Sequence, residues 1–129
     1  MMESDLYSVL ANNAAVGALV GGTGSAARVY PLVRPQAAAL PAVTYQVIDK
    51  PRLDTASLSG HNARVRARVQ VDCWALVYAD VKSLAAAVRA ALLSASTFTA
   101  LNLDDRDLFE DDTLIYRVSA DFSVWHLEA

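Results

Sequence analysis

The chain has 129 residues, the size of one globular domain, and can bury a core without disulfides or bound metal. Its net charge of −3 and pI of about 5.2 argue against a broadly basic surface that would bind nucleic acid. The single cysteine, Cys73, excludes an intrachain disulfide, and no apolar run reaches the ~18 residues of a membrane helix. The opening residues Met1–Asp5 are acidic rather than basic, so we expect no signal peptide and a cytoplasmic site of synthesis.

Apolar residues make up 54% of the chain and charged residues 19%, and alanine accounts for much of the apolar excess. Two interpretations remain open. The alanines can reflect overall composition bias alone, or the chain can have apolar surface left over for a partner.

In the first third of the chain, residues 4–13 are expected to be helical, because Leu6, Val9 and Leu10 recur at the spacing of one helix face. A short helical turn follows, and the glycine-rich segment 21–25 then ends it as a loop. This loop has no preceding strand and no following Lys-Ser/Thr pair, so it does not match a phosphate-binding P-loop.

The middle of the chain predicts strands. Residues 28–31 fit a short edge strand, and residues 43–48 are rich in β-branched and aromatic side chains. From Ala63 to Leu76, apolar and polar residues alternate with a period of two, which is typical of a strand with one buried face. The polar segment 51–62 between the two longer strands is expected to close an antiparallel hairpin.

Residues 80–94 predict an amphipathic helix, with Asp80 as its N-cap and an apolar stripe along one side. The last quarter predicts a second hairpin that turns at residues 110–112 and returns through the alternating segment 114–125. We therefore expect one α+β domain over residues 1–129. It has a mostly antiparallel sheet of two hairpins plus an edge strand, on which the N-terminal helix and the helix near 80–94 pack.

The sequence offers little catalytic chemistry. His61 and His126 have no metal-ligand spacing to each other or to Cys73, which lies on the apolar side of its strand and is expected to be a buried structural thiol. The segment Ser57–His61 brings a serine near a histidine but has no evident orienting partner, and an enzyme that uses Ser59 and His61 is a competing hypothesis. We expect no catalytic residue, no cofactor and no metal site.

Acidic residues are densest between positions 104 and 112, namely Asp104, Asp105, Asp107, Glu110, Asp111 and Asp112. The spacing does not match an EF-hand calcium loop, because the loop glycine and the closing glutamate are missing. A solvated hairpin turn is the simplest interpretation. Two others stay open: a divalent-cation site, and a loop that faces a lumen and repels DNA phosphates.

A ladder of arginines lies on the polar side of the central strand, at Arg64, Arg66 and Arg68, with Asp72 further along the same face. Like charges at this spacing need carboxylates or solvent opposite them, and Asp121 on the last strand is one candidate. The ladder is expected to be a solvent-facing surface with cross-strand pairs, or a contact with acidic residues of a neighbouring subunit such as segment 104–112. Direct phosphate binding is a third possibility.

Several segments in order along the chain resemble the tail-completion family of tailed phages and prophages, whose members are small tail terminators similar in role to the minor tail protein U of phage lambda. The segments that carry this resemblance are Arg28–Pro31, Leu40–Gln46, Val69–Ala75 with Tyr78–Ala79, the helix residues Leu84, Ala85, Val88, Arg89 and Leu92, and Asp121–Trp125. The most distinctive combination is Cys73–Trp74, the alanine-rich helix and the ending Phe122–Trp125.

The resemblance implies a virion structural protein that assembles as a hexameric ring on the last layer of tail-tube protein, stops tube polymerisation and presents a surface to a head-completion or neck protein. DNA would pass through such a ring without specific binding. The family has no catalytic residues to transfer to this chain. There are two further competing hypotheses: a head-closure component of the connector, and a non-phage oligomeric binding module. The candidate subunit or tube interface consists of the arginine ladder, Asp72 and the six acidic residues of segment 104–112.

Overall fold

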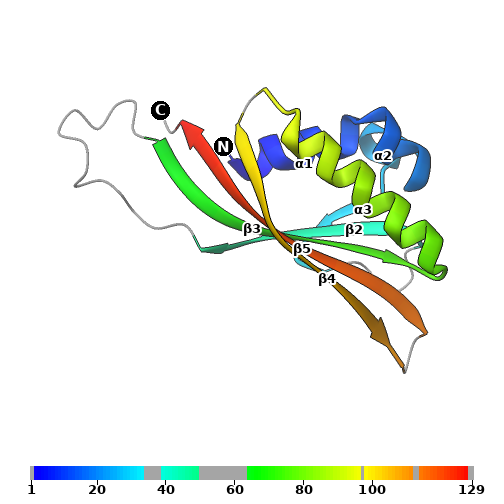
Figure 1. The fold of residues 1–129 in the computed structure, drawn as a ribbon. Coiled ribbons are helices and arrows are strands. Elements are labelled where there is room, and N and C mark those ends of the chain that lie inside the picture. Colours follow the sequence, from blue (N-terminus) through cyan, green and yellow to red (C-terminus); the bar gives the residue numbers. More distant parts are fainter. Residues whose placement is uncertain (1, 34–38, 50–63, 97, 112–113, 128–129) are drawn as a thin grey trace.

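The computed structural model describes residues 2–33, 39–49, 64–96, 98–111 and 114–127, of which 2–3, 49, 64–65 and 126–127 are described by their backbone only. A five-stranded sheet in the order β1-β2-β3-β5-β4 carries three helices on one face (Figure 1). This is the expected α+β architecture. Every neighbouring pair of strands is antiparallel except β1 and β2, which are parallel.

Strands β2 (Ala42–Asp49) and β3 (Arg64–Ala75) form the predicted first hairpin, and β3 also pairs along its whole length with β5 (Ile115–Leu127). The central strand therefore has partners on both sides, which suits its strict alternation. Its apolar positions Ala67, Val69, Val71 and Cys73 are buried beneath the helices. The polar positions between them project from the opposite side, here called the open face of the sheet.

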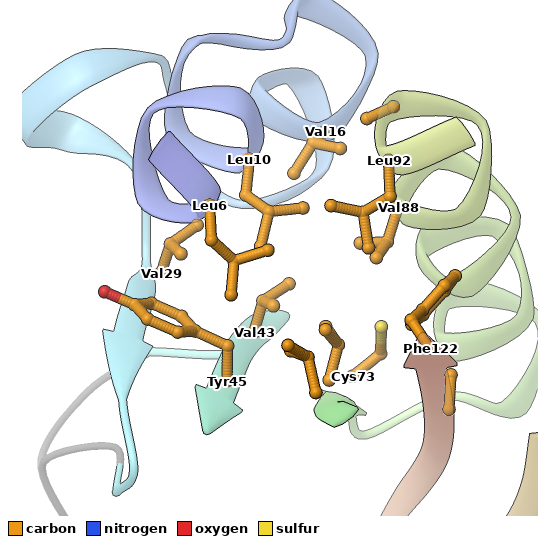
Figure 2. Close-up of a cluster of buried hydrophobic side chains, with 14 of the residues drawn as sticks. Leu6, Leu10, Val16, Val29, Val43, Tyr45, Cys73, Val88, Leu92 and Phe122 are labelled. Carbon is orange, nitrogen blue, oxygen red and sulfur yellow. The ribbon is translucent and has the colours of Figure 1, made fainter. Parts of the chain in front are cut away.

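Helix α1 (Met2–Asn12) contacts β1, and α1 and α2 (Ala14–Leu19) both pack against α3. The Asn13 side chain caps α2 by accepting a hydrogen bond of 3.0 Å from the Val16 backbone N–H. Leu6 and Leu10 are completely buried and meet side chains of the sheet and of α3, as Figure 2 shows. The helical spacing seen in the sequence thus places one apolar stripe of α1 in the core.

Helix α3 spans Tyr78–Leu93 and packs across β3, β5 and β4 through Val81, Leu84, Val88 and Leu92. It begins two residues before the predicted position, and the prediction of Asp80 as its N-cap was wrong. Val77 is the N-cap residue and makes no side-chain capping bond. Asp80 instead lies in the first turn, where its negative charge interacts favourably with the helix dipole.

Strand β4 (Thr99–Glu110) forms the edge of the sheet opposite β1 (Val29–Pro31) and pairs with β5 as the predicted second hairpin. It is longer than expected, because the acidic residues up to Glu110 belong to the strand rather than to a loop. Between Asn102 and Asp104 the register shifts, so Leu103 is an extra residue in a β-bulge.

Candidate interaction surfaces

The residues considered for chemistry do not form a catalytic group within the described part of the chain. Cys73 is 1% exposed, and burial raises the pKa of its thiol, with further increases from the nearby charges of Asp72 and Asp105. A thiol held in its neutral form is a poor nucleophile. The Ser57–His61 segment and the side chain of His126 lie outside the described residues, and so does Asp112. Among the described residues, no group of three His, Cys, Asp or Glu side chains is placed to hold a metal ion.

On the open face, Asp121 is the point where charges from three strands meet. Its carboxylate accepts a hydrogen bond of 2.8 Å from Arg68 on β3 and lies 3.9 Å from the guanidinium of Arg106 on β4. The Asp121 side chain is only 4% exposed, whereas those of Arg68 and Arg106 are 50% and 53% exposed. The salt bridge between Arg68 and Asp121 is the cross-strand pair that the alternating pattern suggested.

Two further arginines of this face, Arg66 and Arg117, lie against tryptophans. The Arg66 guanidinium is 6.0 Å from the centre of the Trp125 ring, and Arg117 is 5.0 Å from that of Trp74. Both distances fit cation–π contacts, which hold the side chains down on the sheet without cancelling their charge. Trp74 in turn donates a hydrogen bond of 3.0 Å to the hydroxyl of Thr44.

Asp72 does not extend the exposed charge of the ladder. It is nearly buried, and the side-chain amide of Gln70 lies 3.1 Å from each of its carboxylate oxygens. The carboxylates of Asp72 and Asp121 are therefore buried against the sheet, while the side chains of Arg66, Arg68 and Arg106 reach solvent. The side chain of Arg64, the first member of the ladder, is outside the described residues.

The acidic segment was expected to be a solvated turn, and for residues 104–110 this expectation was wrong. These residues lie on the edge strand, where the absence of a further strand leaves charged side chains free to reach water. Asp107 accepts hydrogen bonds from Lys82 (3.1 Å and 3.2 Å) and from the Tyr78 hydroxyl (3.0 Å), both on α3. The pKa of Asp107 is lowered mainly by the Lys82 hydrogen bond, and the same bond raises the pKa of Lys82.

A second polar link joins α3 to β4. Arg89 donates to the side-chain oxygen of Asn102 at 3.1 Å, and the Asn102 amide donates to Asp105 at 3.0 Å. Between these links lies an open cavity of about 240 Å³. Its lining combines small side chains such as Cys73, Ala85 and Ala120 with the charged residues Lys82, Arg89 and Asp105. The helix is thus held to the edge strand by polar bridges over a partly unfilled space.

Sequence reasoning missed the exposed apolar residues. One group lies on β4 and consists of Leu101, Leu103, Leu108 and Phe109. A second lies where β3 leads into α3, at Leu76, Val77 and Tyr78, and Leu114 is exposed at the turn between β4 and β5. A third follows β1 and ends β2, at Leu32, Val33 and Ile48. Apolar patches that stay in water are typical of protein–protein contact sites. The spacing of Leu101, Leu103 and Leu108 among acidic residues was the available signal, because one strand face cannot bury all of them.

None of the helices within the described residues is long and apolar enough to cross a membrane. Comparison with solved structures shows a chain of the same fold. A chain in the structure titled "Virion of native gene transfer agent (GTA) particle" superimposes with a TM-score of 0.71 at 21% sequence identity, covering 98% of this chain and 95% of that one. This likeness shows that the two chains share a fold. No curated protein matches the chain.

Residues 4–127 match the protein family described as "Tail completion protein gp17", and the chain belongs to this family. It is therefore a structural protein of phage-type virions with a role in completing the tail, as the resemblance indicated.

Proposed function

We propose that the protein assembles as a hexameric ring on the head-proximal end of the tail tube, stops tube polymerisation there and presents the surface on which the head is joined. The observation that carries this proposal is the family match over residues 4–127, nearly the whole chain. No enzymatic role is part of it, and the buried, protonated Cys73 fits a purely structural protein.

The surfaces described above supply contacts suited to this role. Termination requires one face that matches the tube end and another that does not, or the tube would continue to grow. The open face, with Arg66, Arg68 and Arg106 reaching solvent, suits a partner surface that presents carboxylates. Arg64, Arg66 and Arg68 remain candidate contacts of the tube or of a neighbour, as does the acidic segment 104–112. Asp72 was a candidate too, but its burial under the Gln70 side chain removes it from this set.

The test is tube capping. The purified protein is studied by light scattering over a concentration series, and its largest species by negative-stain imaging. It is then added to purified tail tubes in the presence of free tube subunits. We expect rings with a central hole, alone or on tube ends, and tubes that no longer lengthen. Tubes that grow unchanged, with no protein at their ends, would rule out termination.

Two other outcomes point to the competing functions. Binding to the portal but not to tubes would identify a head-closure component. A stable dimer without affinity for either would indicate an oligomeric binding module.

A further inference from the structure

One end of the molecule, where β3 leads into α3 and the β4–β5 hairpin turns, exposes a group of apolar side chains (Figure 1). Five residues form this group, here called the apolar end: Leu76, Val77, Tyr78, Phe109 and Leu114. Apolar side chains that gather in water at one place are typical of a site where another protein binds.

Beside the apolar end, three aromatic rings line a cavity of about 160 Å³. The centre of the Tyr116 ring lies 5.6 Å from that of Tyr78 and 4.7 Å from that of Phe109. The Tyr78 hydroxyl donates a hydrogen bond of 3.0 Å to Asp107, which fixes the direction of its ring. The cavity is therefore formed before a partner arrives, and it can take one apolar side chain without first being ordered.

Leu114 has a backbone conformation that leucine rarely adopts. Its φ angle is +57°, in the left-handed region that favours glycine and asparagine, and its N–H donates a hydrogen bond of 2.8 Å to the Glu110 carbonyl. The side chain is 64% exposed, so burial in the subunit does not offset this strain. A strained residue whose side chain does little for the fold indicates a use outside the isolated subunit.

Acidic groups outnumber basic groups around the apolar end. In the described part of segments 76–82 and 107–117, the charged residues are Asp80, Asp107, Glu110, Asp111, Lys82 and Arg117. Lys82 and Asp107 pair with each other at 3.1 Å, which leaves three carboxylates against one guanidinium. Two such ends would repel each other, so the charges fit a partner with basic side chains rather than the same end of a second copy.

We infer that the apolar end binds a different virion protein, whose contact surface presents a bulky apolar side chain with lysine or arginine beside it. The apolar side chain enters the cavity between Tyr78 and Phe109, and Leu114 packs against the same partner. The basic side chains pair with Glu110 and Asp111. The inference deepens the proposed function and rests on it, because it names the part of the subunit that meets another component of the particle.

The variant Leu114→Asn separates a contact role from a structural one. Asparagine tolerates the left-handed conformation, so the variant should be no less stable in urea denaturation. We expect it to weaken capping of purified tubes, or binding to purified tail-less heads, about tenfold or more. The matched control is Leu93→Asn, which changes an exposed leucine at the other end of α3 and should leave binding unchanged. Equal binding by the two variants would overturn the inference.

A benzophenone probe attached to Leu114→Cys identifies the occupant, and the native Cys73 is buried. The labelled protein is irradiated on purified tubes and on purified heads, and mass spectrometry locates the cross-linked peptide. We expect a peptide of a tube or head protein with lysine or arginine within a few residues of the cross-link. The same probe on Ser83→Cys, an exposed position of α3, should not give this product. Cross-links to a second copy of this chain, or to a peptide without basic residues, would overturn the inference.

The outcomes also separate this inference from the proposed function. Tubes that the parent protein and Leu114→Asn cap equally well would leave termination intact and overturn the inference. A specific cross-link from position 114 to a head protein, in a subunit that does not cap tubes, would support the inference and remove tube termination. The absence of both capping and cross-links would overturn both.

Discussion

On the open face, the negative charge of Asp121 is balanced by two arginines. A carboxylate that is 4% exposed is stable in its ionised form only when donors surround it, and Arg68 provides a short hydrogen bond while Arg106 provides a more distant charge. Alternation on β5 was enough to place Asp121 on the same side as the arginines. The choice of Arg68 as the bonded partner depends on side-chain geometry that no sequence pattern contains.

The first prediction concerns Asp121→Asn. We expect this variant to lose about 1–3 kcal/mol in the free energy of unfolding, because two guanidiniums then face a neutral amide while Arg68 keeps partial solvation. Urea denaturation measures the change. Asp104→Asn, at an exposed position paired with Asp121 across the strands, is the matched control and should change stability by less than about 0.5 kcal/mol. Equal stabilities of the two variants would show that the Asp121 carboxylate contributes no more to the free energy of unfolding than that of Asp104.

The second prediction follows from the Lys82–Asp107 pair. The pKa of Asp107 is lowered, so its contribution to stability is present above its ordinary value of 3.8 and is lost as the pH falls below it. The pKa of Lys82 is raised, so its contribution is present below 10.5 and is lost as the pH rises above that value. We expect an NMR titration of the Asp107 carboxylate to show a higher midpoint in Lys82→Met than in the parent protein. Lys82→Arg should preserve most of the shift, and an unchanged midpoint in Lys82→Met would contradict the pairing.

At the scale of elements, periodicity was a reliable guide where one face of an element is buried. The alternation of β3 and the apolar stripe of α3 correspond directly to what the structure buries. Periodicity failed for β4, whose charges suggested a loop. An edge strand has solvent along one side. The polar partners of Asp107 and Asn102 come from α3, between 13 and 29 residues earlier in the chain. Contacts between residues distant in sequence cannot be read from a local pattern.

The third prediction concerns Gly17 in α2. A glycine-to-alanine change within a helix ordinarily gains about 1 kcal/mol. Here a β-carbon would lie 2.5 Å from Thr23 Cγ2 and 3.0 Å from the Gly22 carbonyl oxygen. We therefore expect Gly17→Ala to lose about 1–2 kcal/mol in the free energy of unfolding. Adding Thr23→Ser removes the methyl group and should recover part of the loss, which thermal or urea denaturation measures. A stabilised Gly17→Ala variant would show that the turn after α2 adapts freely.

At the scale of the whole molecule, the net charge of −3 is the sum of positive and negative groups that lie on different surfaces. The open face presents guanidiniums to solvent, and the β4 edge presents carboxylates. The sequence pointed to both groups as interface candidates. It did not reveal the exposed leucines between the carboxylates, because composition does not tell which apolar residues remain outside a core.

The fourth prediction tests the acidic edge as a unit. Neutralising two exposed carboxylates in Asp104→Asn/Asp111→Asn should weaken self-assembly or tube capping about 3- to 30-fold, at roughly 0.3–1 kcal/mol for each charge. The control Ser83→Lys/Ala90→Lys changes the net charge by the same amount on the outer side of α3 and should leave assembly unchanged. Quantitative capping assays at low salt measure both. If the two variants behave alike, net charge rather than the β4 edge governs assembly.

The bulge at Leu103 and the charges beside it have a consequence for the time before assembly. A long unpaired strand with regular spacing and exposed leucines would be a template for fibrils at high subunit concentration. The irregular, charged centre of β4 removes that template while its leucines stay accessible. Such subunits are expected to persist as a soluble reserve until the correct partner arrives.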